Sequence, residues 1–313
     1  MSEKEFNLGR PVHRVIEAPT MRPDGSILQK PGLDDATGTY YEPSVSYPAV
    51  DDKPTREECI HHEKALAEVV EDFPFASKDD YVLWLAGLLT SVARPAIQGP
   101  TPLFLVEADQ AATGKTRLAH VAACIAGERN VPSMSLPHDE DEVRKLITAI
   151  LCHGQTFVLL DHVGRMDSQA LSSVLTSTTW ADRRPGTSQL IEAHNRAVWW
   201  ATGTNVAVGG DMTRRVLRIH LKAANESPGT RSDFRHPLLQ LRHPDLLAWV
   251  AHERARLVVS ALSILRGYVV ADRPRRRGAS VLGGFESWTH LIAGAIEWLG
   301  VADPFPTRAA GHG

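Results

Sequence analysis

Apolar residues return at helical spacing from Thr55 to Arg94, after a first stretch that has no such pattern. A break near Pro74 divides this region into two predicted helices. The preceding residues, 1–57, are rich in Pro, Gly, Asp and Tyr and contain several turn dipeptides. We expect them to form short hairpins or an extended arm that does not fold alone.

Between Pro102 and Leu221 short, almost wholly apolar runs alternate with helical patterns, which predicts an α/β core. Two amphipathic stretches, 243–270 and 287–300, follow the core and predict helices. The predicted divisions are an N-terminal extended arm at 1–57, an N-terminal helical pair at 58–98, an α/β core at 99–222 and a C-terminal helical subdomain at 223–313.

Composition narrows the function classes only a little. The chain has 313 residues, of which 43% are hydrophobic and 23% charged, enough to bury the core of one large domain or two modest ones. A net charge of −3 provides no overall attraction to nucleic acid, so a basic contact surface must be local. Three cysteines without a CxxC pair suit a reducing cytosol. Without a signal peptide or a long apolar run, we expect a cytoplasmic protein with no membrane partner.

One short stretch, ADQAATGKTRLA, carries most of a phosphate-binding loop. Gly114, Lys115 and Thr116 match the end of the pattern G-x-x-x-x-G-K-[ST], whereas Asp109 replaces its opening glycine. The buried-strand run PLFLVEA precedes the loop, and a helical run that closes on Gly127 follows it. That order matters because a helix N-terminus offers unpaired N–H groups and a positive dipole end to phosphate. A chance tripeptide at a helix start is the alternative, and the flanking elements make it the weaker one.

Three further elements follow in order. TFVLLDHV is a strand-like run ending near Asp161, where a carboxylate at a strand tip could hold Mg²⁺, although such an Asp is often only a turn residue. AVWWATGTNVAV is another apolar run, and Asn205 near its end could orient an attacking water. Arg214 and Arg215 then stand directly before the strand-like run VLRIHL.

In this order the four elements resemble the helicase-type AAA+ ATPases of bacteriophages and mobile elements, which are related to superfamily 3 helicases. The likeness extends from EAPTMRPDGSILQKPGLDDATGTYY through LLDHV, ATGTN and GGDMTRRVLRIHL to FESWTHLIAGAIEWLGVADP, nearly the whole chain. It implies a three-layer α/β/α P-loop NTPase core with a C-terminal helical lid. It also implies ATP hydrolysis with Mg²⁺ by a homo-hexameric ring on single-stranded or forked DNA. A primase/polymerase or a replication initiator would be a further partner.

The resemblance also implies roles for individual residues. The nucleotide-binding residues would be Ala112, Thr113, Gly114, Lys115, Thr116 and Arg117. Thr116 and Asp161 would hold Mg²⁺. The catalytic residues would be Lys115, Asp161, Asn205, Arg214 and Arg215, with the arginine pair as a finger that reaches the ATP of a neighbouring subunit. The alternative for that pair is local pairing with a carboxylate such as Asp211.

DNA contact is expected from an arginine-bearing turn between the second and third elements. Arg183 and Arg184 directly precede a Pro-Gly turn signal, and Arg196 lies beyond it. In the helicase-like branch a hairpin in this interval grips the nucleic-acid backbone, and guanidinium groups suit phosphate. A solvated surface turn or a second contact between subunits fits the same residues equally well.

Departures from the pattern leave other functions open. Asp109 would repel phosphate unless it faces away, and His162 stands where many AAA+ proteins place a catalytic Glu. Glu107 is then only a candidate for the general base. Two alternatives to a DNA helicase or DNA-stimulated ATPase therefore remain. One is a nucleotide-dependent assembly or loading factor that does not unwind DNA, and the other is a degenerate ATP-binding protein that binds DNA without hydrolysis.

Overall fold

A five-stranded sheet forms the centre of the computed structural model, and each neighbouring pair of its strands is parallel. Across the sheet the strands are β12 (Val216–Leu221), β6 (Leu103–Ala108), β11 (Val198–Val208), β8 (Phe157–Met166) and β7 (Ser133–Met134). The structure describes residues 12, 14–110, 113–128, 130–183, 189–222, 243, 245–274 and 281–301.

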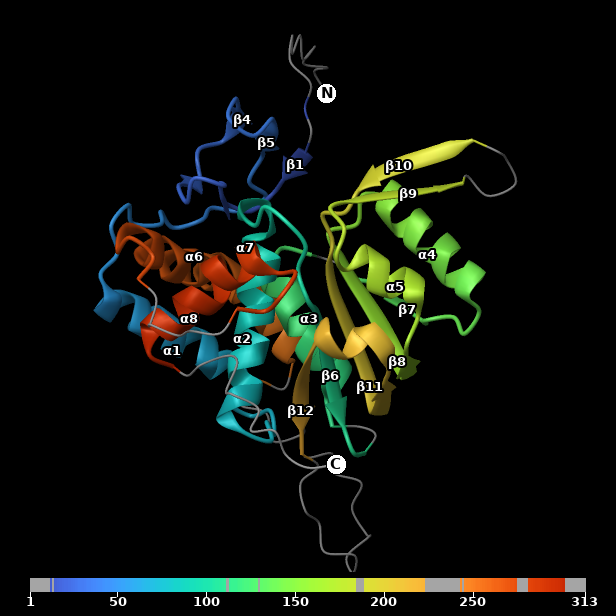
Figure 1. Ribbon diagram of the computed structural model, residues 1–313. Coiled ribbons are helices and arrows are strands. Elements are labelled where there is room, and N and C mark those ends of the chain that lie inside the picture. Colours follow the sequence, from blue (N-terminus) through green and yellow to red (C-terminus); the bar gives the residue numbers. More distant parts are fainter. Residues whose placement is uncertain are drawn as a thin grey trace, which may run out of the picture.

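Both faces of the central sheet are covered. On β6, Phe104 belongs to one hydrophobic cluster and Leu105 to another. On β11, Trp200 belongs to the same cluster as Phe104, and Trp199 belongs to the same cluster as Leu105. Side chains of successive strand residues point to opposite faces, so a continuous apolar run is what a strand buried on both sides requires. The fold is a mixed α/β arrangement in which the sheet lies between two layers of helices (Figure 1).

The two helical layers differ in size. The smaller contains α4 (Glu140–Cys152) and α5 (Gln169–Val174). The larger contains α1 (Arg56–Val69), α2 (Lys78–Val92), α3 (Lys115–Ile125), α6 (Leu246–Val270), α7 (Glu286–Trp288), the π-helical turn Thr289–Ala293 and α8 (Gly294–Leu299). In the larger layer α6 packs against α1, α2 and α3. The helices that precede and follow the core in sequence therefore share one hydrophobic cluster, while the division of the chain into four parts stays a prediction.

Local sequence explains where several helices begin. Thr55 accepts a hydrogen bond from the N–H of Glu58, whose carboxylate accepts one from the N–H of Thr55, so a reciprocal cap starts α1. Ser77 and Asp139 cap α2 and α4 through their side-chain oxygens. The two helices predicted between Thr55 and Arg94 are thus confirmed. No helix within the described ranges combines the length and apolar character that a bilayer crossing requires.

Small β elements surround the core. The N-terminal sheet has the order β1 (Arg14–Ile16), β5 (Thr39–Tyr41), β4 (Gly32–Asp34), and β2 (Thr20–Met21) pairs with β3 (Ile27–Leu28). Met21 is buried in the larger hydrophobic cluster, which agrees with an N-terminal region that needs the rest of the protein. A separate antiparallel hairpin, β9 (Thr179–Arg183) and β10 (Leu190–His194), lies beyond one end of the central sheet (Figure 1).

Candidate nucleotide site

The loop after β6 has the backbone that phosphate binding requires. All six residues of β6 are buried. Gly114, directly before α3, has φ of 88°, a left-handed conformation that glycine adopts without strain. No side chain caps α3, so the first N–H groups of the helix point into the loop. Ala112, one of the predicted nucleotide contacts, lies outside the described residues, as does Ala111.

Lys115 begins α3 and folds back over its own loop. Its Nζ donates to the carbonyl oxygen of Gln110 at 2.8 Å and to Thr113 Oγ1 at 3.2 Å. Burial lowers the pKa of Lys115, and the Asp161 carboxylate partly opposes that shift. Thr113 is buried beside it, and Arg117 lies on the first turn of α3. The ammonium group therefore sits where the glycine loop and the helix N-terminus meet.

Asp161 approaches the same point from β8. Its Oδ1 accepts hydrogen bonds from Thr116 Oγ1 at 3.0 Å, from the N–H of His162 at 3.0 Å, and from the Thr202 hydroxyl. Burial, the largest single influence, would raise the pKa of Asp161, but the bonds from Thr202 and Thr116 together with His162 outweigh it and lower the pKa. The carboxyl group is thus held as the anion beside the loop. Sequence reasoning missed Thr202, whose only signal was its place on the strand run before Asn205.

A β-bulge at Asp161 and His162 sets this geometry. Leu160 is paired with Ala201 and Val163 with Gly203, so two residues on β8 oppose one on β11. His162 has φ of 58°, and its exposed ring places Nδ1 3.2 Å from Asp161 Oδ2. The strand predicted to end near Asp161 instead continues to Met166. The carboxylate therefore lies within the strand.

Asn205 lies beside the phosphate loop, as its proposed role requires. Its Nδ2 is 3.4 Å from the carbonyl oxygen of Asp109, and its own backbone is left-handed with φ of 51°. Both residues are exposed. The structure thus brings Gly114, Lys115 and Thr116, which follow the carboxyl end of β6, together with Asp161 of β8 and Asn205 of β11. The carboxyl ends of parallel strands are where α/β proteins bind ligands.

Glu107 does not have the surroundings of a free general base. Its side chain is 4% exposed, and its two oxygens accept from Arg218 Nε and Nη2 at 2.6 and 2.9 Å. His220 Nε2 lies 3.2 Å from the same carboxylate. The bond to Glu107 raises the pKa of Arg218. Glu107 is therefore engaged in an ion pair between β6 and β12, which disfavours it as the base.

The two arginines before β12 are in different environments. Arg214 is 76% exposed and pairs with Asp211 at 2.7 Å across one turn of the short 3₁₀ helix Gly210–Arg214. Arg215 is 21% exposed and donates through Nη1 to the Ser172 carbonyl oxygen of α5 at 2.5 Å. The local pairing with Asp211 named as the alternative is thus present for both arginines, at 2.7 Å for Arg214 and 3.7 Å for Arg215. Arg215 also binds α5 of the same chain, whereas Arg214 stays exposed.

The three arginines expected to bind DNA do not form one group in the structure. Arg183 is exposed at the end of β9, next to the hairpin turn. Arg184 lies outside the described residues. Arg196 follows β10, at the base of the hairpin and away from its turn. The hairpin itself is confirmed, and DNA contact stays a prediction.

The donor set suits Mg²⁺ held jointly with phosphate. The described part of the chain contains no cluster of three or more His, Cys, Asp or Glu residues that could hold a metal alone. Mg²⁺ is typically bound by one or two carboxylates together with substrate phosphates and water. Thr116 Oγ1 and Asp161 Oδ1, 3.0 Å apart beside the helix N-terminus, fit that mode.

Comparison with known proteins identifies no family. No family model matches the chain, and no curated protein matches it. Among solved structures, the apo C-terminal region of NrS-1 has a TM-score of 0.41 at 14% identity, covering 74% of this chain and 54% of that one. A second form of that region gives a TM-score of 0.39 at 15% identity and covers 75% and 52%. An inhibitor-bound JCV helicase gives 0.32 at 13% identity and covers 81% and 70%. The chain thus spans about half the length of the NrS-1 region, and likenesses of this size establish neither family nor activity.

Proposed function

We propose that this protein is a Mg²⁺-dependent ATPase of the helicase-type AAA+ class that acts on DNA as an oligomeric ring. The observation that carries the proposal is the 3.0 Å contact between Thr116 Oγ1 and Asp161 Oδ1 at the N-terminus of α3. This contact joins the phosphate loop to the strand that carries Asp161, although the two residues are 45 positions apart in the sequence. An ordinary helix start has no reason to carry a left-handed glycine, a lysine folded over the loop and an ionised aspartate together.

Each residue at this site has a role that its geometry supports. The N–H groups of α3 and the Lys115 ammonium would bind the terminal phosphates, with Lys115 exchanging the Gln110 carbonyl for phosphate oxygen. Thr116 and Asp161 would hold Mg²⁺, which when bound neutralises charge on the transferred phosphoryl group. The Thr202 hydroxyl fixes the direction of the Asp161 carboxylate. Asn205, beside the loop, would orient the attacking water.

A test of the site is ATP hydrolysis with and without Mg²⁺ in wild-type protein and in Thr116→Val. We expect hydrolysis to require Mg²⁺ and to fall at least about 10²-fold in the variant, because a methyl group replaces the metal-binding hydroxyl. The matched control is Thr176→Val, which changes an exposed threonine at the end of α5. Undiminished hydrolysis in Thr116→Val would exclude this site.

Action on DNA by a ring is tested separately. We expect single-stranded or forked DNA to stimulate hydrolysis, and Arg183 near the hairpin turn to contribute to that response. Arg214 is the proposed arginine finger because it is the exposed member of the pair, whereas Arg215 is bonded to Ser172 of its own subunit. Such a finger can raise the rate about 10³-fold or more.

The ring experiment mixes wild-type protein with Arg214→Ala in varied proportions. If Arg214 acts on a neighbour, activity should fall more steeply than the wild-type fraction, while the variant alone still binds ATP. Arg215→Ala is the comparison variant. We expect it to lower the stability of the protein, without reducing the ATPase activity of the mixture more steeply than the wild-type fraction. Rates proportional to the wild-type fraction, with a monomeric mass in the presence of ATP and DNA, would contradict the ring.

A nucleotide-dependent assembly or loading factor is the second candidate, and one observation favours it. Both oxygens of Glu107 accept hydrogen bonds from Arg218, and His162 follows Asp161 and lies beside its carboxylate. Neither Glu107 nor Asp161 is therefore a free carboxylate that could act as a general base. That arrangement fits slow turnover. A strand-displacement assay on forked DNA separates the two candidates, because an assembly factor would form rings with ATP but release no strand.

A further inference from the structure

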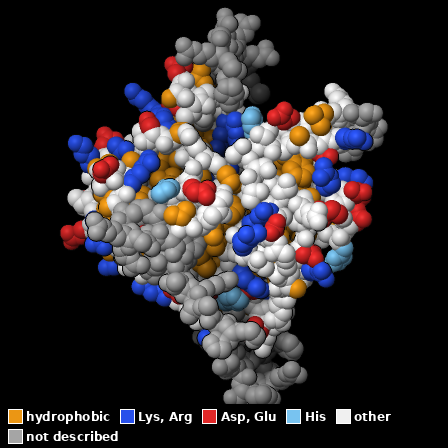
Figure 2. Space-filling view, viewed as in Figure 1, with side chains coloured by type: hydrophobic (Ala, Val, Ile, Leu, Met, Phe, Trp, Pro, Cys, Tyr) orange, Lys and Arg blue, Asp and Glu red, His pale blue; other side chains and the backbone are white. Residues whose placement is uncertain are grey.

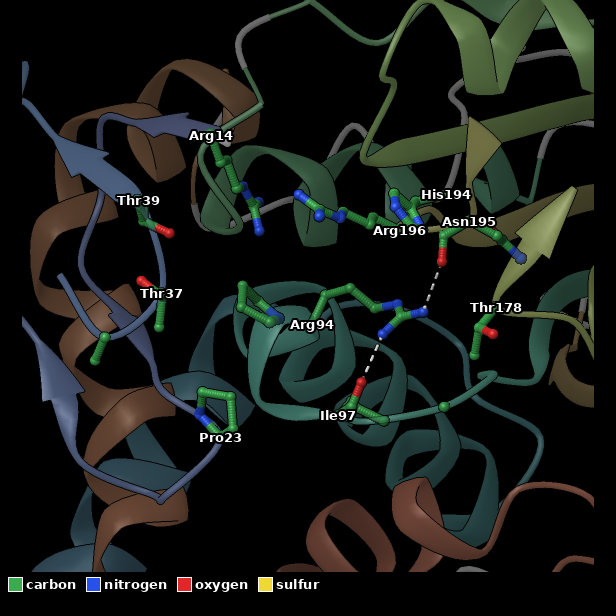
Figure 3. Close-up of a pocket in the computed structure, with 13 residues that line it drawn as sticks. Arg14, Pro23, Thr37, Thr39, Arg94, Ile97, Thr178, His194, Asn195 and Arg196 are labelled. Atoms are coloured by element: carbon green, nitrogen blue, oxygen red, sulfur yellow. Dashed lines mark hydrogen bonds between the residues drawn. The ribbon is translucent and has the colours of Figure 1, made fainter. Parts of the chain in front are cut away.

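Three arginine side chains line one pocket at the end of the central sheet away from the phosphate loop. The pocket has a volume of about 360 Å³; Arg14 and Arg196 direct their guanidinium groups toward its space, and Arg94 lines it with its guanidinium turned to the carbonyl oxygens of Ile97 and Asn195 (Figure 3). Arg14 comes from β1 of the N-terminal sheet, Arg94 from the turn after α2, and Arg196 from the segment between β10 and β11. Contacts between distant parts of the chain therefore bring these arginines together, and no local sequence motif predicts the cluster.

Arg94 forms the fixed floor of the pocket. It is 7% exposed, and its Nη1 and Nη2 donate to the carbonyl oxygens of Ile97 at 2.9 Å and Asn195 at 3.1 Å. Among the residues that the structure describes, none accepts a hydrogen bond from its buried Nε. A buried guanidinium held by two neutral carbonyls, with a donor left over, keeps an uncompensated positive charge.

The charges around Arg94 increase that imbalance. Burial, followed by the charges of Arg14 and Arg196, lowers the pKa of Arg94 to about 10. Burial is also the main cause that lowers the pKa of Arg14, where Arg196 adds to the effect and Glu128 partly opposes it. The residues that line the pocket within the described ranges include no Asp or Glu. An anion is the ligand that would relieve this arrangement.

We propose that this pocket binds a phosphate group carried by a nucleic-acid strand. Guanidinium groups match phosphate with paired, charge-assisted hydrogen bonds, so Arg14 and Arg196 can hold one phosphate while Arg94 adds positive charge from the floor of the pocket. Thr39 and His194 line the same pocket and add a hydroxyl and an imidazole (Figure 3).

The position of the pocket favours a strand over a free anion. Lys and Arg atoms, with a neighbouring His, meet the surface between the N-terminal sheet and the β9–β10 hairpin (Figure 2). Arg196 and His194 are exposed at this rim, so a long ligand can enter without displacing the fold. A strand that contacts Arg183 near the hairpin turn could continue along the hairpin to its base. The choice of a nucleic-acid strand rests on the proposed function, whereas phosphate binding by the pocket does not.

The test uses full-length protein carrying Lys115→Ala, so that phosphate bound at the loop does not contribute. Thermal melting is followed against inorganic phosphate, with chloride keeping the ionic strength constant, and single-stranded oligonucleotide binding is followed by fluorescence anisotropy. We expect Arg14→Ala and Arg196→Ala to weaken both ligands about 10-fold, and the Arg→Lys variants to restore part of the affinity. Arg256→Ala, which removes an exposed arginine paired with Glu253 on α6, is the control and should change neither.

Each outcome decides one part of the inference. Loss of both ligands in the Arg14 and Arg196 variants, with the Arg256 variant unchanged, supports a strand phosphate in the pocket. Loss of phosphate binding alone overturns the strand as its source and leaves a site for a free anion. Phosphate dependence that is equal in all variants overturns the pocket. ATP hydrolysis in the protein with Lys115 intact reports on the proposed function independently.

Discussion

The phosphate loop and the arginine pocket lie at opposite ends of the same parallel sheet. The loop follows the carboxyl end of β6, whereas the pocket is built from residues that precede β6 and β11. At the loop, Lys115 has the Asp161 carboxylate near it and the N–H groups of a helix beside it. At the pocket, three arginines line one space whose described lining includes no carboxylate.

This difference shows two ways of preparing a site for phosphate. A helix N-terminus supplies partial positive charge from backbone groups, so one lysine suffices, and an aspartate can remain nearby to bind a metal. Where no helix begins, side chains must provide all of the charge. The first arrangement suits a ligand that brings its own cation, and the second suits a phosphate that arrives without one.

The largest effect is expected at the loop. Lys115→Ala should lower ATP hydrolysis by at least about 10²-fold, because the ammonium group stabilises charge that develops on the phosphates. Phosphate binding at the arginine pocket should remain. Lys145→Ala, which removes an exposed lysine paired with Glu142, serves as the control. If one substitution abolished both activities, the two sites would not be independent.

Asp161→Asn should reduce turnover by about 10²-fold while nucleotide binding changes only a few-fold, since the amide keeps the shape of the carboxylate but not its charge. The measurement is hydrolysis against Mg²⁺ concentration, together with binding of a fluorescent ATP analogue. Asp167→Asn, an exposed aspartate bonded to Arg165, is the matched control. Equal Mg²⁺ dependence in wild type and Asp161→Asn would remove Asp161 from the mechanism.

Glu107→Gln tests how much the ion pair between Glu107 and Arg218 contributes to the free energy of unfolding. The substitution leaves Arg218 without its ionised partner, so we expect the free energy of unfolding to fall by about 2 kcal/mol. Urea denaturation measures this change. Glu253→Gln breaks the more exposed pair with Arg256 and should change stability by less than about 0.5 kcal/mol. Similar losses of unfolding free energy in the two variants would mean that the buried Glu107–Arg218 pair stabilises the protein no more than the exposed Glu253–Arg256 pair.

The smallest effect is expected from Arg196→Ala in chloride buffer without phosphate. Removing an exposed arginine that faces Arg14 and Arg94 should change the free energy of unfolding by less than about 0.5 kcal/mol, or raise it. The same urea assay provides the number. A loss well above 1 kcal/mol would assign Arg196 a structural role and weaken the comparison between the two ends of the sheet.

Sequence patterns predicted the parts of the molecule that depend on neighbouring residues. The strand, loop and helix around Gly114 follow from a local motif, and the hairpin of β9 and β10 was expected from the family resemblance together with a Pro-Gly turn signal. The contact of Thr202 with Asp161 was not predictable, because it depends on which strands become neighbours and on a bulge between them.

The arginine pocket shows the same limit more strongly. Arg196 was predicted to contact DNA, but its place in one pocket with Arg14 and Arg94 requires the N-terminal sheet to fold against the turn after α2. The distinction between Arg214 and Arg215 likewise depends on α5, which supplies the Ser172 carbonyl to only one of them. Tertiary neighbours, and not spacing, decided these cases.

The bulge at His162 constrains how this strand can change over evolutionary time. Leu160 and Val163 are three positions apart and yet belong to the same hydrophobic cluster, because the bulge takes up the extra residue between them. Deleting His162 would restore regular pairing and leave Leu160 and Val163 on the same face, but it would remove the bulge that sets the position of the Asp161 carboxylate, whereas the exposed side chain of His162 can change freely. Chain length here should therefore be kept in any descendant, while the residue at 162 drifts among those that accept a left-handed backbone, such as Gly, Asn and Asp.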